Sequence, residues 1–470
     1  MNPLSMSRTL APFALIAILT FASATVAVAD AGQEARQEAI AIAWIEAHNS
    51  ADVETMAAFR AKHFQLSEVK DWQSSFESMV EELGTLKVRG VMIDASGQIK
   101  VKVHASGLDE SLRLGFNFDA DRPDQIRMIG ADMGGGGDGE EGIPTADISG
   151  GDWSERSPKL DRYLAQLAAD GYFSGTVLIA DKSGVKYRKA VGLASREFSV
   201  PNTLETRFDI GSCNKDYTRI AILALRDQGK LSLDDKVGRH LPDYPNERVR
   251  NEVTIGQLLE HRSGLGDYFT DEWFDTPMGS LREIEDYIPI WGPKPLLHEP
   301  GSREYYTNYG YTVLGAIIEK ISGERFDEHV VRTIFKPLGM TRTGFFETDA
   351  VVPDVAVGYT RINFDGSPRE RVAKNIYLEP AKGGPWGKSY ATVDDMHRFY
   401  TGIIDGKLLS GESNFLAGGW DRGGIALAGG GPGLSATMRL EGGHMVIVLA
   451  NMDPPSSELL SDILAEGVER

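Results

Sequence analysis

The stretch from Phe208 to Gly229 constrains the fold and the chemistry of this chain more than any other. Apolar side chains fill most positions from Ile220 to Leu225, which predicts a buried helix over residues 212–228 that ends at Gly229. Ser212 and Lys215 are three residues apart at its start and therefore share one face. Free N–H groups and the positive end of the helix dipole favour developing negative charge there. This arrangement suits a serine nucleophile with an amine beside it.

Two interpretations of Ser212 and Lys215 remain open from these residues alone. Ser-x-x-Lys is short and common, and the first interpretation is a helix cap followed by a solvated lysine. The second is a nucleophile and its base. Three further stretches favour the second, because with the first they resemble, in order, the motifs of the serine beta-lactamase-like family. These stretches are Leu231–Asp235, Val253–Leu265 and Glu304–Gly315.

This family includes class C beta-lactamases, D,D-peptidases and related esterases, and the resemblance covers roughly Ser157 to the C-terminus. It implies an α+β fold, in which an antiparallel sheet carries a mostly helical half and the active site lies at their junction. Hairpin patterns at residues 175–191 and 435–450 support such a sheet, shared by the two ends of the region.

The resemblance also implies roles for individual residues. Ser212 would attack the substrate, and Lys215 would act as its base if burial and nearby positive groups hold the amine partly neutral. The family motif Tyr-x-Asn matches Tyr306 and Asn308, which implies a proton-relaying phenol and a hydrogen-bond donor to a substrate amide. Taken alone, Tyr306 is better interpreted as an aromatic side chain packed over a helix start.

The third motif of the family is where this sequence departs. The family has Lys-Thr-Gly or His-x-Gly on a strand beside the nucleophile, whereas the matching stretch here places Leu427 at the cationic position and Gly429 at the motif glycine. The backbone N–H of Gly430 would join that of Ser212 as the oxyanion hole. The missing cation weakens the case for penicillins and stem peptides, which carry a carboxylate, relative to a neutral ester or amide.

The residues that precede the region of family resemblance are predicted to form an accessory domain and a linker. Helical patterns followed by alternating strands predict a small α+β domain over residues 30–133. Its element order resembles the cone-shaped domain of the nuclear-transport-factor-two-like superfamily. The glycine-rich, acidic run at residues 134–142 predicts a linker over 134–155, ahead of the hydrolase domain at 156–470.

The first residues and the composition bear on localisation and partners. Arg8, an apolar run to Val28 and the sequence Ala27-Val-Ala29 predict a signal peptide over residues 1–29, with a retained membrane anchor as the alternative. We therefore expect a periplasmic or secreted protein without stable membrane insertion after signal removal. Acidic residues outnumber basic ones 68 to 49, and the net charge of −19 excludes a nucleic-acid partner.

Several other side chains could take part in chemistry. Cys213 is the only cysteine, and it points away from Ser212 around the helix, which favours a buried packing role over a second nucleophile. His261 matches a structural segment of the family. Three histidines of the first region lack ligand spacing and are interpreted as packing or surface residues: His48, His63 and His104.

Two classes of function remain. The first is a serine hydrolase that acts on a small-molecule or peptide substrate through an acyl-enzyme and needs no metal or cofactor. The second is an inactive relative that binds cell-wall or lipid fragments in the same cleft, motivated by Leu427. Lys388 and Arg422 are cations that could replace the missing group, but nothing in the spacing aims either at the site.

Overall fold

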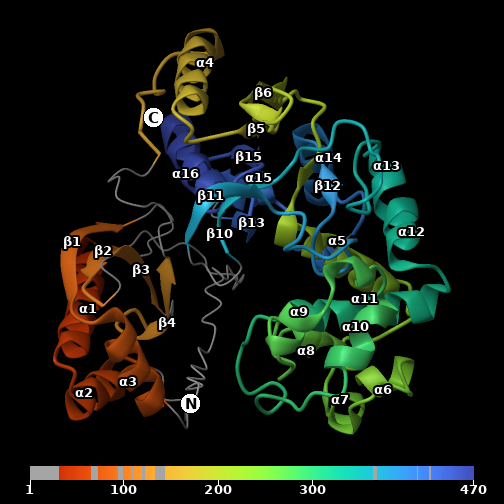
Figure 1. The fold of residues 1–470 in the computed structure, drawn as a ribbon, viewed down its shortest axis with the longest axis horizontal. Helices are drawn as coiled ribbons and strands as arrows, with labels where there is room; N and C mark the ends of the chain where they lie inside the picture. The colour runs from red at the N-terminus through yellow and green to blue at the C-terminus, as the bar shows by residue number, and fades with distance from the viewer. Residues whose placement is uncertain are drawn as a thin grey trace, which may run out of the picture. The chain divides into compact units, whose positions relative to one another are not determined.

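The structure is a computed structural model that describes residues 31–64, 72–93, 99–107, 110–118, 122–132, 143–363, 368–409, 411–422 and 425–469. The predicted signal peptide and residues 134–142 of the predicted linker lie outside these ranges. The chain divides into two compact units, and the boundary between them in the sequence falls between Gly136 and Gly137 (Figure 1). Within the described ranges, no helix is both long and apolar enough to cross a membrane.

The first unit packs three helices with a four-stranded antiparallel sheet in the order β1-β2-β3-β4. Alternate residues of β2 face the core, and Val101 and Val103 are fully buried there. The second helix begins after Asp52, whose side chain caps it by accepting from the Thr55 amide at 2.8 Å. The resemblance to the nuclear-transport-factor-two-like superfamily stays a prediction. The elements are α1 (Ala31–Asn49), α2 (Val53–His63), α3 (Trp72–Leu83), β1 (Leu86–Ile93), β2 (Ile99–Ala105), β3 (Glu110–Phe118) and β4 (Ile126–Asp132).

The second unit is built on a five-stranded antiparallel sheet in the order β13-β14-β15-β5-β6. The two predicted hairpins are therefore neighbours in one sheet, and β15 of the C-terminal hairpin pairs with β5 of the N-terminal one. Strand β13 lies at the edge of this sheet. The elements are β5 (Gly175–Asp181), β6 (Gly184–Val191), β13 (Ile425–Gly431), β14 (Leu434–Glu441) and β15 (His444–Ala450).

Both faces of this sheet are buried, which explains why its central strands read as continuous apolar runs. On β5, Val177 and Ile179 face the helices α4 (Trp153–Ala169) and α16 (Ser456–Glu469), whereas Leu178 faces the helical half. Figure 1 shows α4 and α16 together beside the strands. The sheet therefore forms the middle layer between two helices on one side and the helical half on the other.

The helical half supplies the elements that surround the candidate site. The helix predicted over 212–228 begins with one 3₁₀ turn, η1 (Gly211–Asn214), and continues as α5 (Lys215–Asp227). The other helices are α6 (Val237–His240), α7 (Glu247–Glu252), α8 (Ile255–Leu259), α9 (Asp271–Asp275), α10 (Ile284–Trp291), α11 (Asn308–Ser322), α12 (Phe326–Val330), α13 (Lys336–Leu338), α14 (Val393–Ile404) and α15 (Gly419–Arg422), with single turns η2 (Met278–Ser280), η3 (Val331–Phe335) and η4 (Gly411–Ser413).

Short strand pairs join these layers. They are β7 (Leu193–Ser195) with β8 (Val200–Pro201), β9 (Phe208–Asp209) with β12 (Tyr390–Ala391), and β10 (Tyr359–Ile362) with β11 (Pro368–Lys374). The β9–β12 pair is the one that matters for the site, because β9 leads directly into η1.

Residues ahead of the predicted boundary at residue 156 pack against the second unit. Ile143 and Ile148 are buried in the core formed by α4, α16 and the sheet, and the Tyr163 hydroxyl donates to the carbonyl of Pro144 at 2.6 Å. Helix α4 begins at Trp153 because the Asp152 side chain caps it, accepting from the Ser154 amide at 2.8 Å. Residues 143–155 therefore belong to the packed unit.

Truncation of Leu164, which is fully buried in this core, should lower the free energy of unfolding by about 2–5 kcal/mol, because the cavity left by Leu164→Ala cannot fully collapse. The matched control is Leu297→Ala, whose side chain is 55% exposed and should cost below about 1 kcal/mol. Urea denaturation of the full chain, followed by circular dichroism, measures both. Equal losses would contradict the assignment of this core.

Candidate active site

Ser212 lies in the η1 turn, where it contacts two of the residues predicted to act with it. Its Oγ accepts a hydrogen bond from Lys215 Nζ at 3.0 Å and lies 2.8 Å from the Tyr306 hydroxyl. Asp209 stabilises this turn, because its Oδ1 accepts a hydrogen bond from the Gly211 amide at 2.9 Å. The structure thus brings together a serine, a lysine and a tyrosine from segments 94 residues apart.

The surroundings of the Lys215 ammonium show how it can act as a base. Besides Ser212 Oγ, its Nζ donates to Asn308 Oδ1 at 2.7 Å and to the Trp386 carbonyl at 2.6 Å. A neutral amine keeps two N–H groups, which satisfy these two acceptors and leave its lone pair for the Ser212 hydroxyl proton. Burial lowers the pKa of Lys215 to about 7, although the nearby Asp267 carboxyl opposes this shift.

Tyr306 is held as a neutral phenol. Burial raises its pKa well above the ordinary value, while the hydrogen bond with Ser212 acts in the opposite direction. Its ring stacks on His261, with ring centroids 4.4 Å apart, and the Lys215 ammonium lies 4.9 Å from the Tyr306 ring centroid. Tyr306 can therefore pass a proton between the Ser212 oxygen and a bound group.

Asn308 begins helix α11, and both ends of its amide already have partners within the protein. Its Oδ1 accepts from Lys215, and its Nδ2 donates to Asp267 Oδ2 at 2.8 Å. The predicted role of Asn308 as a donor to a substrate amide stays a prediction. In this structure it connects the base to a buried carboxyl group.

Asp267 is a residue that sequence reasoning missed. Its carboxylate accepts from the Asn308 amide at 3.1 Å and the Tyr309 amide at 3.3 Å, so it satisfies the first free N–H groups of α11 as well as the Asn308 side chain. Burial raises the pKa of Asp267 in spite of these hydrogen bonds. It acts from 41 residues away, and no local pattern could have identified it.

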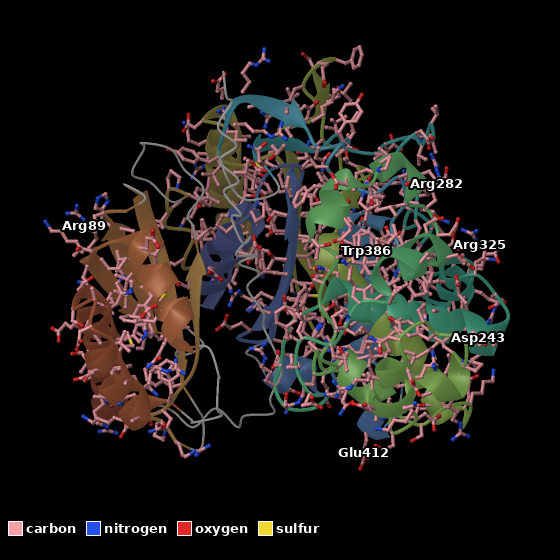
Figure 2. All side chains as sticks on the ribbon, turned by 60° about the horizontal axis from the view of Figure 1, so that its bottom comes forward. Arg89, Asp243, Arg282, Arg325, Trp386 and Glu412 are labelled. Carbon is pink, nitrogen blue, oxygen red and sulfur yellow. The ribbon has the colours of Figure 1, made fainter. Side chains whose placement is uncertain are left out.

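The loop from Pro380 to Lys388, called the 380–388 loop, supplies a second unpredicted part of the site. Three successive carbonyls face η1 and α5: those of Gly384, Pro385 and Trp386 accept from Asn214, Thr218 and Lys215 at 2.8, 2.6 and 2.6 Å. Trp386 is 8% exposed and lies among the packed side chains of the second unit (Figure 2). The loop thus holds the nucleophile turn through its main chain.

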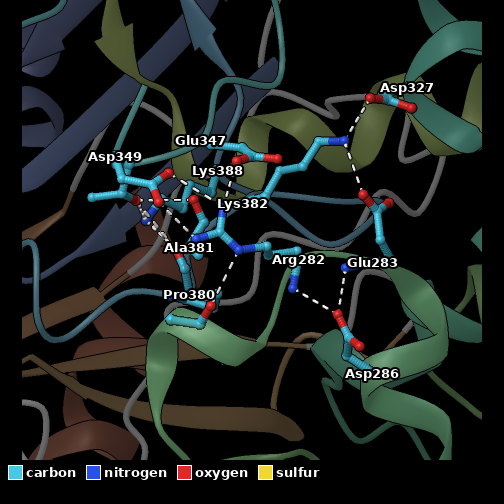
Figure 3. Close-up of polar contacts among 12 residues, drawn as sticks. Arg282, Glu283, Asp286, Asp327, Glu347, Asp349, Pro380, Ala381, Lys382 and Lys388 are labelled. Atoms are coloured by element: carbon cyan, nitrogen blue, oxygen red, sulfur yellow. Dashed lines mark hydrogen bonds and ion pairs between the residues drawn. The ribbon is translucent and has the colours of Figure 1, made fainter. Parts of the chain in front are cut away.

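Ion pairs and hydrogen bonds anchor this loop. Lys382 Nζ lies 2.7 Å from Asp327 Oδ2 and 3.5 Å from Glu283 Oε1 (Figure 3). The amide of Ala381 donates to the carbonyl of Met278 at 2.9 Å. Lys382 is only 7% exposed, so the lysine end of these pairs is largely removed from solvent while its carboxylate partners lie partly at the surface.

Strand β13 lies against the nucleophile turn at the residues predicted for the third motif. A Cβ atom on Gly429 would lie 2.2 Å from the Ile210 carbonyl oxygen and 2.6 Å from the Ser212 amide nitrogen, so only glycine fits there. A Cβ atom on Gly211 would lie 3.0 Å from the Gly430 amide nitrogen. The Ser212 turn and Gly430 therefore approach each other across the edge of the sheet, as an oxyanion hole requires.

Leu427 lies two residues before Gly429 and therefore on the same face of β13. It is half-buried and packs against the apolar core of the helical half. An apolar side chain thus occupies the position at which the resemblance predicted a cation.

The other sequence candidates have structural partners. Burial raises the pKa of the Cys213 thiol, which donates to the Ala436 carbonyl at 3.8 Å. Burial lowers the pKa of His261 to about 3, and its Nδ1 accepts from the Thr307 amide at 3.2 Å. Lys388 donates to the Pro380 carbonyl at 2.5 Å, and the Arg422 side chain lies outside the described residues. In the described part of the chain, no group of three or more His, Cys, Asp or Glu side chains could hold a metal ion.

The fold and the Ser212–Lys215–Tyr306 arrangement match the predicted class, and the comparisons with known proteins agree. The family model described as Beta-lactamase matches residues 160–458, and the chain belongs to this family. The predicted α+β, beta-lactamase-like fold is confirmed.

The relatives are named as penicillin-binding proteins and peptidases. A protein of Bacillus subtilis (strain 168) named as penicillin-binding protein PbpX is 34% identical over 58% of this chain and 63% of its own length. A protein of Escherichia coli (strain K12) named as a D-alanyl-D-alanine carboxypeptidase is 32% identical over 41% of this chain and 47% of its own length. The chain thus spans less than two thirds of these curated relatives.

A solved structure is also similar to this chain. The penicillin-binding protein of Bacillus halodurans is 29% identical and has a TM-score of 0.56, with 64% of this chain and 99% of that chain covered. The predicted class, a serine hydrolase of the beta-lactamase-like family, is the class of these relatives.

A methyl group at Gly429 should disable the site. The Gly429→Ala variant must push Ile210 or the Ser212 amide aside, and we expect fluorophosphonate labelling of Ser212 to fall by about 100-fold or more, the effect of losing an oxyanion-hole donor. The matched control is Gly279→Ala, because a Cβ atom there meets nothing within 4 Å. Labelling rates followed by intact-mass analysis measure both. Unchanged labelling of Gly429→Ala would contradict this geometry.

Proposed function

We propose that this chain is a serine hydrolase that forms an acyl-enzyme on Ser212 and hydrolyses an ester or amide. The observation that carries the proposal is the short contact of Ser212 Oγ with both Lys215 Nζ and Tyr306 Oη, at 3.0 and 2.8 Å. A serine hydroxyl needs a base within hydrogen-bond reach, and a buried lysine with a pKa near 7 meets this need.

The proposed reaction follows from these contacts. Neutral Lys215 takes the Ser212 proton while Oγ attacks the substrate carbonyl carbon. The N–H groups of Ser212 and Gly430 receive the developing oxyanion. The proton passes, directly or through Tyr306, to the leaving alcohol or amine, and the acyl group remains on Ser212. A water molecule then attacks the acyl-enzyme with the same base, and the carboxylic acid leaves.

The proposed substrates are neutral esters or amides rather than molecules with a carboxylate beside the reacting bond. Leu427 supports this preference, because an apolar side chain on the nucleophile-facing side of β13 cannot pair with a carboxylate. The alternative function, an inactive protein that binds cell-wall or lipid fragments, is motivated by the same residue. It differs from the hydrolase in one testable respect, which is the reactivity of Ser212.

The proposal includes export to the periplasm or the medium. It is supported by Arg8, by the apolar run that follows it and by the small residues Ala27 and Ala29 at the predicted cleavage site. A mature chain that begins at Asp30, found by mass analysis of the protein outside the cytoplasm, is the expected result.

Intact-mass analysis with three reagents tests the hydrolase. We expect the wild-type chain to gain a fluorophosphonate adduct and to turn over p-nitrophenyl acetate faster than it reacts with a penicillin. The Ser212→Ala variant should do neither, because it lacks the nucleophile. A folded wild-type chain that forms no adduct with any reagent would leave the inactive binding protein as the function.

The pH dependence of labelling tests the role of Lys215. Below pH 7 the ammonium is protonated and cannot accept the Ser212 proton, so the labelling rate should rise through a midpoint near the Lys215 pKa of about 7. In Lys215→Arg, whose guanidinium stays charged, the rate should fall by about 100-fold or more and the rise should disappear. Fluorophosphonate labelling from about pH 5 to about pH 9 measures both. The same profile in both proteins would rule out Lys215 as the base.

A further inference from the structure

A cavity of about 210 Å³ lies in the second unit beside strand β9, and none of the predicted catalytic side chains lines it. Engineered cavities of about 150 Å³ hold a benzene molecule, so this one has room for a substituted aromatic ring. Much of its wall is apolar, with contributions from Phe208, Phe346, Val355 and Leu434. Its wall also contains three buried ionisable side chains: Asp209, Glu379 and Lys388.

Glu379 is the unusual member of this group. Its side chain is 8% exposed, and within the described ranges its carboxyl group makes no hydrogen bond or ion pair. A buried carboxyl group without a hydrogen-bond donor is costly to ionise. Burial accordingly raises the pKa of Glu379 to about 7. Asp209, in contrast, accepts from the Gly211 amide at 2.9 Å.

The charges that line the cavity do not balance. Lys388 is the one buried cation of the lining, and its ammonium donates to the Pro380 carbonyl at 2.5 Å and to Thr348 Oγ1 at 3.2 Å (Figure 3). The buried carboxyl groups of Asp209 and Glu379 line the same cavity and interact electrostatically with Lys388. If both carboxyl groups are ionised, one negative charge therefore remains without a counterion.

The other charged residues of the lining are already paired near the surface. Glu347 pairs with Arg282, and Lys374 lies 3.0 Å from Glu197. Neither supplies the missing positive charge. A ligand that carries an ammonium group would supply it and would also provide hydrogen-bond donors for the Glu379 carboxylate.

The Glu379 carboxylate lies near the nucleophile along strand β13. A Cβ atom on Gly431 would lie 3.5 Å from Glu379 Oε1, and one on Gly429 would lie 2.6 Å from the Ser212 amide nitrogen. Residues two apart on a strand point to the same face and are separated by roughly 6.7 Å. Glu379 and Ser212 thus contact the same face of β13 at neighbouring positions.

We propose that this cavity is a binding site for a small organic ammonium with an apolar body, and that the ammonium pairs with Glu379. The apolar body packs against Phe208, Phe346 and Leu434. The site does not depend on the acyl-enzyme chemistry, because none of Ser212, Lys215 and Tyr306 lines the cavity.

Isothermal titration calorimetry on the full-length Ser212→Ala variant tests the proposal without interference from catalysis. Phenethylamine should bind saturably with one site per chain. The matched neutral ligand, 2-phenylethanol, should bind weaker by about tenfold or more, because it leaves the charge of Glu379 unpaired. Adding Glu379→Gln should weaken phenethylamine binding by a similar factor, whereas Glu247→Gln on the exposed surface of α7 should not change it.

Two results would overturn the proposal. One is equal affinity for the amine and the alcohol. This comparison can be interpreted even if the Glu379→Gln variant does not fold. The other is full retention of phenethylamine binding in a folded Glu379→Gln variant. Fluorophosphonate labelling of the wild-type chain is a separate readout, so a failure of the hydrolase proposal and a failure of this one are distinguishable.

Discussion

The burial of the Lys215 side chain is the constraint on which the rest of the site depends. A fully buried amine is costly unless its donors are matched, and each of its acceptors comes from a different segment: the η1 turn, the start of α11 and the 380–388 loop. Each of those segments is in turn held in place, α11 by Asp267 and the loop by Lys382. Segments of the helical half therefore meet at the Lys215 Nζ atom. The burial and the hydrogen bonds that they provide set the protonation state of this amine.

The sequence predicted the parts of this arrangement that are local or periodic. The two hairpins followed from alternation and turn residues, the buried helix after Ser212 from its apolar run, and the family from motifs in order. Asp267 and the carbonyls of the 380–388 loop were not predictable, because they act across the fold and, for the loop, through main-chain atoms that every residue has. The packing of residues 143–155 was not predictable, because Ile143 and Ile148 are isolated apolar residues whose burial depends on α16.

On strand β13, the backbone geometry beside the Ser212 turn does not depend on the cationic side chain that is missing from the third motif. At Gly429 the constraint is the absence of a Cβ atom, and at Gly430 it is a backbone N–H group, so neither depends on the residue at position 427. Leu427 packs against the apolar core and leaves no cation at that position of the strand, which is the basis of the proposed preference for neutral substrates. In the proposed hydrolase, different atoms of the same strand would therefore control reactivity and substrate charge.

The 380–388 loop has a consequence for how such a protein can diverge. Its contacts to Asn214, Thr218 and Lys215 are all made by carbonyl oxygens, so they survive a change of side chain at Pro385 or Trp386 that leaves the backbone path intact. The indole of Trp386 packs beside Tyr268 and Tyr287 and is not itself a partner of the lysine. Side chains at this wall can therefore change while the hydrogen bonds of Lys215 are retained, so that the shape of the wall can diverge independently of the proposed base.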